Sequence, residues 1–243
     1  MTDDGFIALH FVTCVSNLDV LSKRLLASPC LRDGCYPLTA CFNAQSAAEA
    51  FNAAAMSISE PNAWLVWVHQ DVFLPAGWDA QFKTRLMDAR AAFSALAVVG
   101  VYGVAGSGTD SRRAGHVLDR GQLLHESAAL PCRADSLDEL LFAVRCNSGL
   151  RLDPLLPWDF YATDLVLQAQ SNGYQAAVVD AYCEHWSDTP ANGAVPRRLV
   201  ERIAASGSVF ESKWAHRLPV QTTWMSVERA GDVRRLIDSV AVS

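Results

Sequence analysis

The feature that most constrains the fold is a run of apolar residues with no polar face, from Ala63 to Val68. A strand exposed on one face alternates apolar and polar residues, so this run is typical of a central strand that helices cover on both faces. Further runs of strand length occupy Phe6 to Val15, Leu38 to Phe42, Leu96 to Val104 and Ala176 to Ala181, and segments of helical period separate them. This alternation predicts an α/β fold with a mostly parallel, doubly wound sheet flanked by helices.

The composition excludes several classes of protein. The chain has 243 residues, of which 51% are hydrophobic and 19% charged, so it carries enough apolar surface for a large core and is not intrinsically disordered. With 20 basic and 26 acidic side chains the net charge is −6, which argues against binding along a nucleic-acid backbone. Seven cysteines without a C-x-x-C pair indicate reduced thiols rather than a disulfide framework or a zinc ribbon.

Targeting signals are also absent from the sequence. The N-terminus, Met1 to Asp4, is acidic and lacks the basic and apolar regions of a secretory signal. The longest uncharged stretch, Ala91 to Thr109, contains four glycines and two serines and fits a helix end followed by a buried strand better than a membrane span. We therefore expect a cytoplasmic protein without a transmembrane segment.

Two segments have the spacing of a helix-capping box, in which the side chains of Ser at the cap and of Glu three residues later each accept a hydrogen bond from a backbone N–H group. They are Ser46 to Glu49 and Ser136 to Glu139. Each is followed by apolar residues of helical period, so the sequence predicts a helix after both. The stretch Gly106 to Gly121, rich in Gly, Ser and Arg, is predicted to be a surface loop that can close over a ligand.

Candidate functional residues follow the strands, because ligands of doubly wound sheets lie beyond the carboxyl ends of the strands. Asp71 ends the most apolar strand, and its carboxylate can hold a hard divalent cation; the alternative is a turn residue. His69 lies on the same strand face as Asp71 and is a ligand or a packed histidine. His185 follows the last strand, where imidazole is either a metal ligand or structural. Asp164, at a predicted helix start, can accept a proton or simply complement the helix dipole.

The order of these residues resembles the GT-A-fold glycosyltransferases, in particular a family-2-like group with a "VHQD" variant of the D-x-D motif. The resemblance lies in Val68-His-Gln-Asp71, in Phe160-Tyr-Ala-Thr-Asp164-Leu and in Glu184-His185, within residues 5–187. It implies a GT-A-like fold that binds a nucleotide-diphosphate sugar as donor substrate, with a divalent cation, Mn²⁺ or Mg²⁺, as cofactor. His69 stands where the first acid of the D-x-D motif is found.

The resemblance assigns roles residue by residue. Asp71 and His185 correspond to metal ligands, with His69 as a further candidate ligand, and Asp164 corresponds to the base that deprotonates the acceptor hydroxyl in inverting members. Positions that bind the nucleotide correspond to Thr13, Val15, Ser16, Asn52, Gln70 and Asp71. Positions on the acceptor side correspond to Asp138, Glu139, Trp158 and Tyr161, although Asp138 and Glu139 are equally well explained as capping residues.

The predicted function is transfer of a single sugar to an acceptor hydroxyl, since the Q-x-x-R-W signature of processive synthases is missing. The resemblance implies a glycan or a lipid-linked acceptor, which would place the enzyme in the cytoplasm, at times against the inner face of the membrane. Two alternatives remain: a non-catalytic nucleotide- or glycan-binding protein of the same fold, and a sugar-phosphate nucleotidyltransferase. We predict a catalytic domain over 1–189 and a C-terminal extension over 190–243, and a homodimer is left open.

Overall fold

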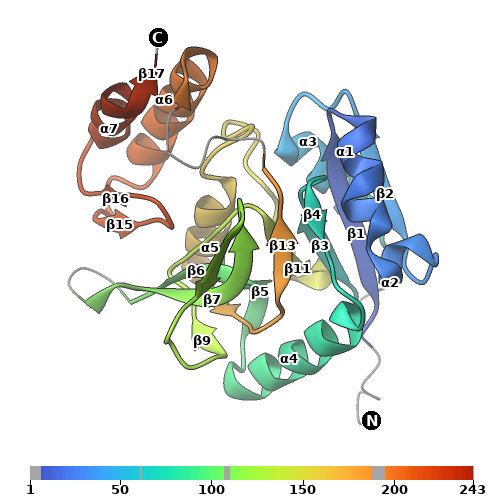
Figure 1. Cartoon of the computed structure of the whole chain (residues 1–243). Helices are drawn as coiled ribbons and strands as arrows, with labels where there is room; N and C mark the ends of the chain where they lie inside the picture. The colour runs from blue at the N-terminus through green and yellow to red at the C-terminus, as the bar shows by residue number, and fades with distance from the viewer. Residues whose placement is uncertain (1–6, 61, 107–109, 188–194, 243) are drawn as a thin grey trace.

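The computed structural model describes residues 7–60, 62–106, 110–187 and 195–242. It has an α/β fold in which helices cover both faces of a central sheet, and the C-terminal helices lie together beside one end of it (Figure 1).

The central sheet has seven strands in the order β2-β1-β3-β11-β5-β12-β9. Strand β1 is parallel to β2 and β3, and β12 is parallel to β5, whereas β11 is antiparallel to both of its neighbours. The predicted mostly parallel sheet is therefore confirmed, with β11 as the reversed strand inside it. The strands are β1 (Leu9–Val15), β2 (Leu38–Phe42), β3 (Trp64–Val68), β5 (Leu96–Gly100), β9 (Cys132–Arg133), β11 (Leu141–Arg145) and β12 (Gln175–Val178).

The position of β3 between two hydrophobic cores explains why its sequence has no polar face. Leu65 and Trp67 point into one hydrophobic core, and Trp64, Val66 and Val68 point into the other, so every residue of the strand is buried. Helices α3 (Ala47–Ser57) and α5 (Tyr161–Ser171) pack in the first core, and α1 (Leu18–Lys23), α2 (Pro29–Arg32) and α4 (Trp78–Ala92) pack in the second. Short 3-10 turns occur at Leu25–Ala27 and Cys146–Ser148.

The first capping box is present at the start of α3. The Ser46 hydroxyl accepts a hydrogen bond from the Glu49 backbone N–H at 2.9 Å, and the Glu49 carboxylate accepts from the Gln45 backbone N–H at 2.6 Å. The prediction of a helix from this spacing is confirmed here.

The second capping box does not start a helix, and the prediction of one was wrong. Ser136–Leu137 forms the short strand β10, and Leu141–Arg145 is β11. Leu141 to Val144 are buried on both faces between β3 and β5, and a helix exposed to solvent on one side cannot bury four consecutive residues in this way. The tertiary environment overrides the local cap signal.

A second sheet has six strands, in the order β10-β6-β7-β13-β4 with β8 paired to β7. The predicted surface loop between Gly106 and Gly121 is largely strand β7, which pairs with β6, β8 and β13; residues 107–109 of that loop lie outside the described residues. The additional strands are β4 (Val72–Phe73), β6 (Tyr102–Ala105), β7 (Arg112–Asp119), β8 (Gln122–His125) and β13 (Cys183–His185).

The C-terminal segment packs on the main core through α5. Phe210, Trp214, Met225 and Val227 are buried in the same cluster as the inner face of α5. The elements are β14 (Val195–Pro196), α6 (Arg197–Lys213), β15 (Val220–Gln221), β16 (Ser226–Val227), α7 (Asp232–Val240) and β17 (Ala241–Val242). The predicted boundary between 189 and 190 falls in residues 188–194, outside the described residues. Across the described part of the chain, no helix is long and apolar enough to cross a membrane.

Candidate active site

Three predicted metal ligands come together where β3 ends. His69, Asp71 and His185 each offer one ligand atom, and these atoms lie within 4.8 Å of one another. The Nε2 atom of His185 lies 3.4 Å from Oδ1 of Asp71, and the two imidazole rings are 5.6 Å apart between centroids. The structure therefore joins residues that are more than one hundred positions apart in the chain.

The pairing of β4 with β13 brings Asp71 and His185 together. After β3 the chain turns at His69, whose carbonyl accepts a hydrogen bond from the Val72 backbone N–H at 3.1 Å, and continues into β4. Strand β13 pairs antiparallel with β4, with His185 opposite Val72, and the Trp186 backbone N–H donates to the Asp71 carbonyl at 3.0 Å. Asp71 and His185 consequently face each other across two short strands.

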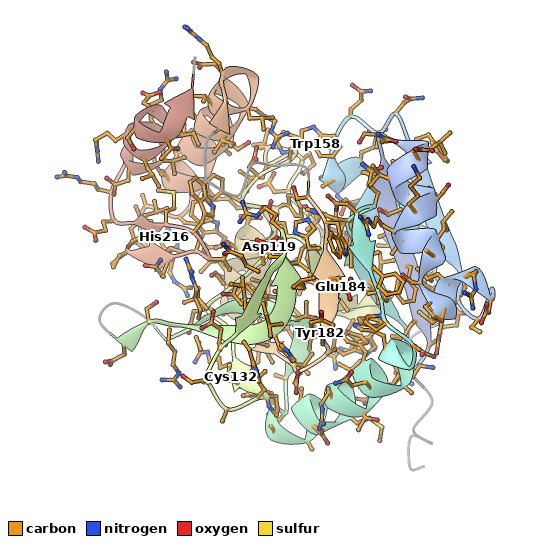
Figure 2. All side chains as sticks on the ribbon, in the orientation of Figure 1. Asp119, Cys132, Trp158, Tyr182, Glu184 and His216 are labelled. Carbon is orange, nitrogen blue, oxygen red and sulfur yellow. The ribbon has the colours of Figure 1, made fainter. Side chains whose placement is uncertain are left out.

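A surrounding set of hydrogen bonds orients the two histidines. Nδ1 of His185 lies 2.8 Å from Oδ1 of Asp119, near the centre of the molecule (Figure 2), and Nε2 of His69 lies 3.0 Å from the hydroxyl of Tyr161. Metal-binding histidines in general hold their second nitrogen in such a bond, which fixes the tautomer and the ring. Asp119 has no sequence motif around it, and our sequence analysis missed it.

The charges of the cluster follow from these contacts. Burial alone would lower the pKa of His185, but the hydrogen bonds to Asp119 and Asp71 raise it to about 10. Burial would raise the pKa of Asp71, but the bond and charge of His185 hold it at about 2. Burial lowers the pKa of His69 to about 4, so this imidazole is neutral and keeps a lone pair. The neutral His69 can bind a cation as it stands, whereas His185 can do so through Nε2 only on releasing its proton, so a cation and a proton compete for this cluster.

The donor set fits a divalent transition-metal ion. Imidazole nitrogen suits ions such as Zn²⁺, Fe²⁺ and Ni²⁺, and Mn²⁺ accepts a mixture of imidazole and carboxylate ligands more readily than Mg²⁺, which prefers an all-oxygen shell with several waters. His69, Asp71 and His185 together offer two nitrogens and one carboxylate, and the remaining positions are left for water or a ligand.

A cavity of about 490 Å³ opens beside the cluster and has the position expected of a nucleotide pocket. Four of the residues predicted to bind the nucleotide line it, namely Val15, Ser16, Gln70 and Asp71. The Gln70 amide also braces the end of β1, because its oxygen accepts from the backbone N–H groups of Ser16 and Asn17, each at 3.0 Å. Other lining residues, which the sequence did not reveal, include Cys14, Cys41, Asn43, Trp67 and Arg202.

Two residues predicted for the acceptor side also line this cavity. They are Trp158, which lies near the upper edge of the molecule in Figure 2, and Tyr161, whose hydroxyl meets His69.

Two other predicted nucleotide contacts lie away from the cavity. Thr13 is fully buried in β1, and its hydroxyl donates to the Cys14 carbonyl at 3.4 Å. The Asn52 amide is held by the backbone of Leu152, with hydrogen bonds of 2.9 and 3.0 Å. Both residues support the walls of the site rather than its surface.

A second, smaller cavity of about 200 Å³ is lined by Asp138, Glu139 and His69. The two acidic residues lie just before β11, and because β11 is antiparallel to β3, with Leu141 opposite Val68, its start lies at the edge where β3 ends. Thr222, Thr223 and Trp224 form another wall of this cavity, and Trp224 is 46% exposed. We call this cavity the acidic pocket.

Asp164 is not open to either cavity, which corrects the expectation of an accessible acid at this position. The residue is 0% exposed in the first turn of α5 and faces α6. Its carboxylate lies 2.7 Å from Nζ of Lys213 and accepts hydrogen bonds from the Trp214 indole at 2.7 Å and the Gln168 amide at 2.6 Å. With both carboxylate oxygens engaged inside the protein, Asp164 holds the C-terminal segment on the core.

The fold is shared with solved structures. The mannosyltransferase PcManGT from Pyrobaculum calidifontis, solved in complex with GDP-Man and Mn²⁺, matches over 88% of this chain with a TM-score of 0.50 and 10% identity. TarS residues 1–349 from S. aureus, in complex with UDP-GlcNAc, match over 82% of the chain with a TM-score of 0.46 and 9% identity.

The chain spans 65% of the length of each of these two structures. No protein-family model matches the sequence, and no curated protein is significantly similar to it. The likeness to the mannosyltransferase confirms the expected α/β, GT-A-like fold, and at this level of identity it shows the fold alone.

Proposed function

We propose that the protein is a glycosyltransferase that uses a nucleotide-diphosphate sugar and a divalent cation to glycosylate an acceptor hydroxyl. The observation that carries this proposal is the meeting of His69, Asp71 and His185 at the rim of a 490 Å³ cavity, at the carboxyl edge of a sheet of glycosyltransferase-like fold. A ligand site at this edge is the general rule for sheets of this kind.

The donor would lie in the larger cavity, with its diphosphate toward Asp71 and its base beyond the end of β1. The cavity is polar where Ser16, Asn43 and Gln70 reach it and apolar where Trp67 and Trp158 do, which suits a nucleoside. Arg202, at the rim, is the nearby fixed positive charge that would complement the diphosphate.

A cation held by His69, Asp71 and His185 would stabilise the negative charge that grows on the diphosphate as the sugar leaves. The mannosyltransferase was solved in complex with GDP-Man and Mn²⁺, and the nitrogen-containing donor set of this chain favours a transition-metal ion such as Mn²⁺ over Mg²⁺ for the same purpose. The proposed acceptor is a sugar or a lipid-linked hydroxyl, bound from the side of the acidic pocket and Trp224.

A second candidate, a non-catalytic nucleotide- or glycan-binding protein, is favoured by one observation. The acid expected to act as the base, Asp164, is sequestered between α5 and α6. Release of nucleoside diphosphate from a nucleotide sugar, at a rate above that of buffer and dependent on Mn²⁺, would exclude this candidate.

The proposal is tested by calorimetric titration of GDP and UDP, with and without Mn²⁺, into the wild-type protein and Asp71→Ala. We expect Mn²⁺ to tighten binding to the wild type by at least about 100-fold, since a metal bridge adds several kcal/mol of charge stabilisation. The Asp71→Ala protein should show no such gain. Equal affinities for both proteins in all conditions would contradict the metal and diphosphate assignment.

A further inference from the structure

The acidic pocket holds three carboxylates, and their hydrogen bonds separate them. Asp159 is engaged by Arg202 at 2.8 and 3.0 Å and by the Ser206 hydroxyl at 3.3 Å. Asp138 accepts from the Leu140 backbone N–H at 3.1 Å and from the Thr223 hydroxyl at 2.9 Å, one bond to each oxygen. Both side chains are fixed by their partners.

Glu139 differs from its two neighbours. Among the described residues no side chain forms a salt bridge or hydrogen bond with its carboxylate, which accepts from the Tyr161 backbone N–H at the start of α5, and the side chain lines the pocket beside His69. Its backbone is held firmly, because its carbonyl accepts a hydrogen bond from the Trp67 indole at 3.0 Å. A carboxylate on a fixed backbone, with a single backbone donor for its four lone-pair sites, keeps capacity to bind something that enters the pocket.

We propose that Glu139 is the catalytic base that takes the proton from the acceptor hydroxyl. The inference rests on the proposed glycosyl transfer and names a residue for its proton. As the hydroxyl oxygen bonds to the anomeric carbon, the bond from that carbon to the diphosphate oxygen breaks. The electron pair leaves with the nucleoside diphosphate, and the hydroxyl proton passes to the Glu139 carboxylate.

The position of Glu139 fits this role. It shares the pocket with His69, a member of the metal cluster, so the pocket adjoins the point where the donor diphosphate would bind. On its other side the pocket is bounded by Thr223 and the half-exposed Trp224, which leaves an approach for an acceptor. Asp164, buried against Lys213 and Trp214, has neither neighbour.

The surroundings also make Glu139 a better proton acceptor than an ordinary carboxylate. Its pKa lies well above the usual 4.5, because the side chain is desolvated and lies beside the charges of Asp159 and Asp138, with Arg202 and the Tyr161 backbone N–H acting in the opposite direction. The neutral imidazole of His69 faces the same pocket. A base with a raised pKa needs less driving force to take a proton from a hydroxyl.

The test compares Glu139→Gln with the wild type in the Mn²⁺-dependent release of GDP from GDP-mannose and of UDP from UDP-GlcNAc, with water as acceptor. Glu60→Gln, a change of an exposed glutamate far from the pocket, is the matched control. We expect kcat of Glu139→Gln to fall about 10²- to 10⁴-fold, the effect typical of losing a general base. Calorimetric GDP and UDP affinities should stay within about twofold of the wild type, since the donor pocket is untouched.

The pH profile separates a base from a structural residue. In the wild type, log kcat should rise with pH and level off above the pKa of Glu139, and this acidic limb should disappear in Glu139→Gln. Glu139→Asp should keep the limb at a reduced kcat, because it retains a carboxylate at a shorter reach.

A Glu139→Gln protein that binds GDP and UDP, keeps kcat within about threefold of the wild type and keeps the acidic limb would overturn the assignment of Glu139 as the base. The proposed function would not be affected by that result. A wild-type protein that neither binds nor turns over these nucleotides would overturn the proposed function, and the role of Glu139 with it.

Discussion

Two groups of acids near the start of α5 use the same residue types in opposite ways. Between α5 and α6, Asp164 is enclosed by Lys213, Trp214 and Gln168, which occupy three of its four lone-pair sites. At the rim of the sheet, Asp71 and Glu139 face cavities, and their neighbours leave room for a ligand. The number of unused lone pairs, rather than the depth of burial, separates a structural acid from a functional one.

The largest expected effect on stability is at the structural cluster. Asp164→Ala leaves the Trp214 indole N–H buried without a partner and removes one of the two carboxylates around Lys213, so we expect unfolding free energy to fall by about 3 kcal/mol. Denaturant titration measures this loss. Asp88→Ala, which removes an exposed ion pair with Arg85 on α4, is the control and should cost under about 1 kcal/mol.

The comparison would fail if Asp164, rather than Glu139, were the catalytic base. A folded Asp164→Ala protein should bind GDP and Mn²⁺ as the wild type does, and its turnover, measured below its melting temperature, should remain within a few-fold. A stable Asp164→Ala protein that has lost turnover would return the role of base to Asp164.

The sequence predicted the metal cluster better than the acidic pocket, and the reason is local. His69 and Asp71 directly follow β3, and His185, the last residue of β13, comes soon after the predicted strand from Ala176 to Ala181, so the strand pattern places all three near one edge. Glu139 lies in a segment whose Ser-x-x-Glu spacing imitates a helix cap, and only the antiparallel pairing of β11 brings it to that edge. Asp164 was correctly predicted at a helix start, but its partners in the C-terminal segment lie about fifty residues later, and no sequence pattern indicates that they pack against it.

A smaller effect, on metal affinity, is expected at Asp119, whose carboxylate orients the His185 ring. Asp119→Asn weakens the bond that orients His185, and the loss of such a supporting carboxylate lowers metal affinity about 10- to 100-fold in general. Titration of Mn²⁺ followed by electron paramagnetic resonance measures the free ion directly. Asp19→Asn, an exposed acid on α1, should leave the affinity unchanged, and an unchanged affinity in Asp119→Asn as well would remove Asp119 from the site.

The smallest expected effect is on the folding stability of the protein, through the buried carboxyl group of Glu139 in the acidic pocket. A carboxyl group whose pKa is raised on folding holds its proton more tightly in the folded state, so the folded state loses relative stability as the pH rises from about 4.5 through the folded pKa. Glu139→Gln removes this loss and should melt at a higher temperature than the wild type, by a margin that grows with pH over that window. A margin that is constant or shrinks with pH would show that Glu139 is not desolvated as described.

The central claim is that the His69, Asp71 and His185 cluster holds the cation on the donor diphosphate, and a crystal structure with GDP and Mn²⁺ tests it most directly. Anomalous scattering at the manganese edge should place one ion within bonding distance of Asp71 and His185 and of the GDP diphosphate, with the nucleoside in the cavity lined by Val15 and Trp158. An ion bound elsewhere, or GDP ordered outside this cavity, would contradict the account.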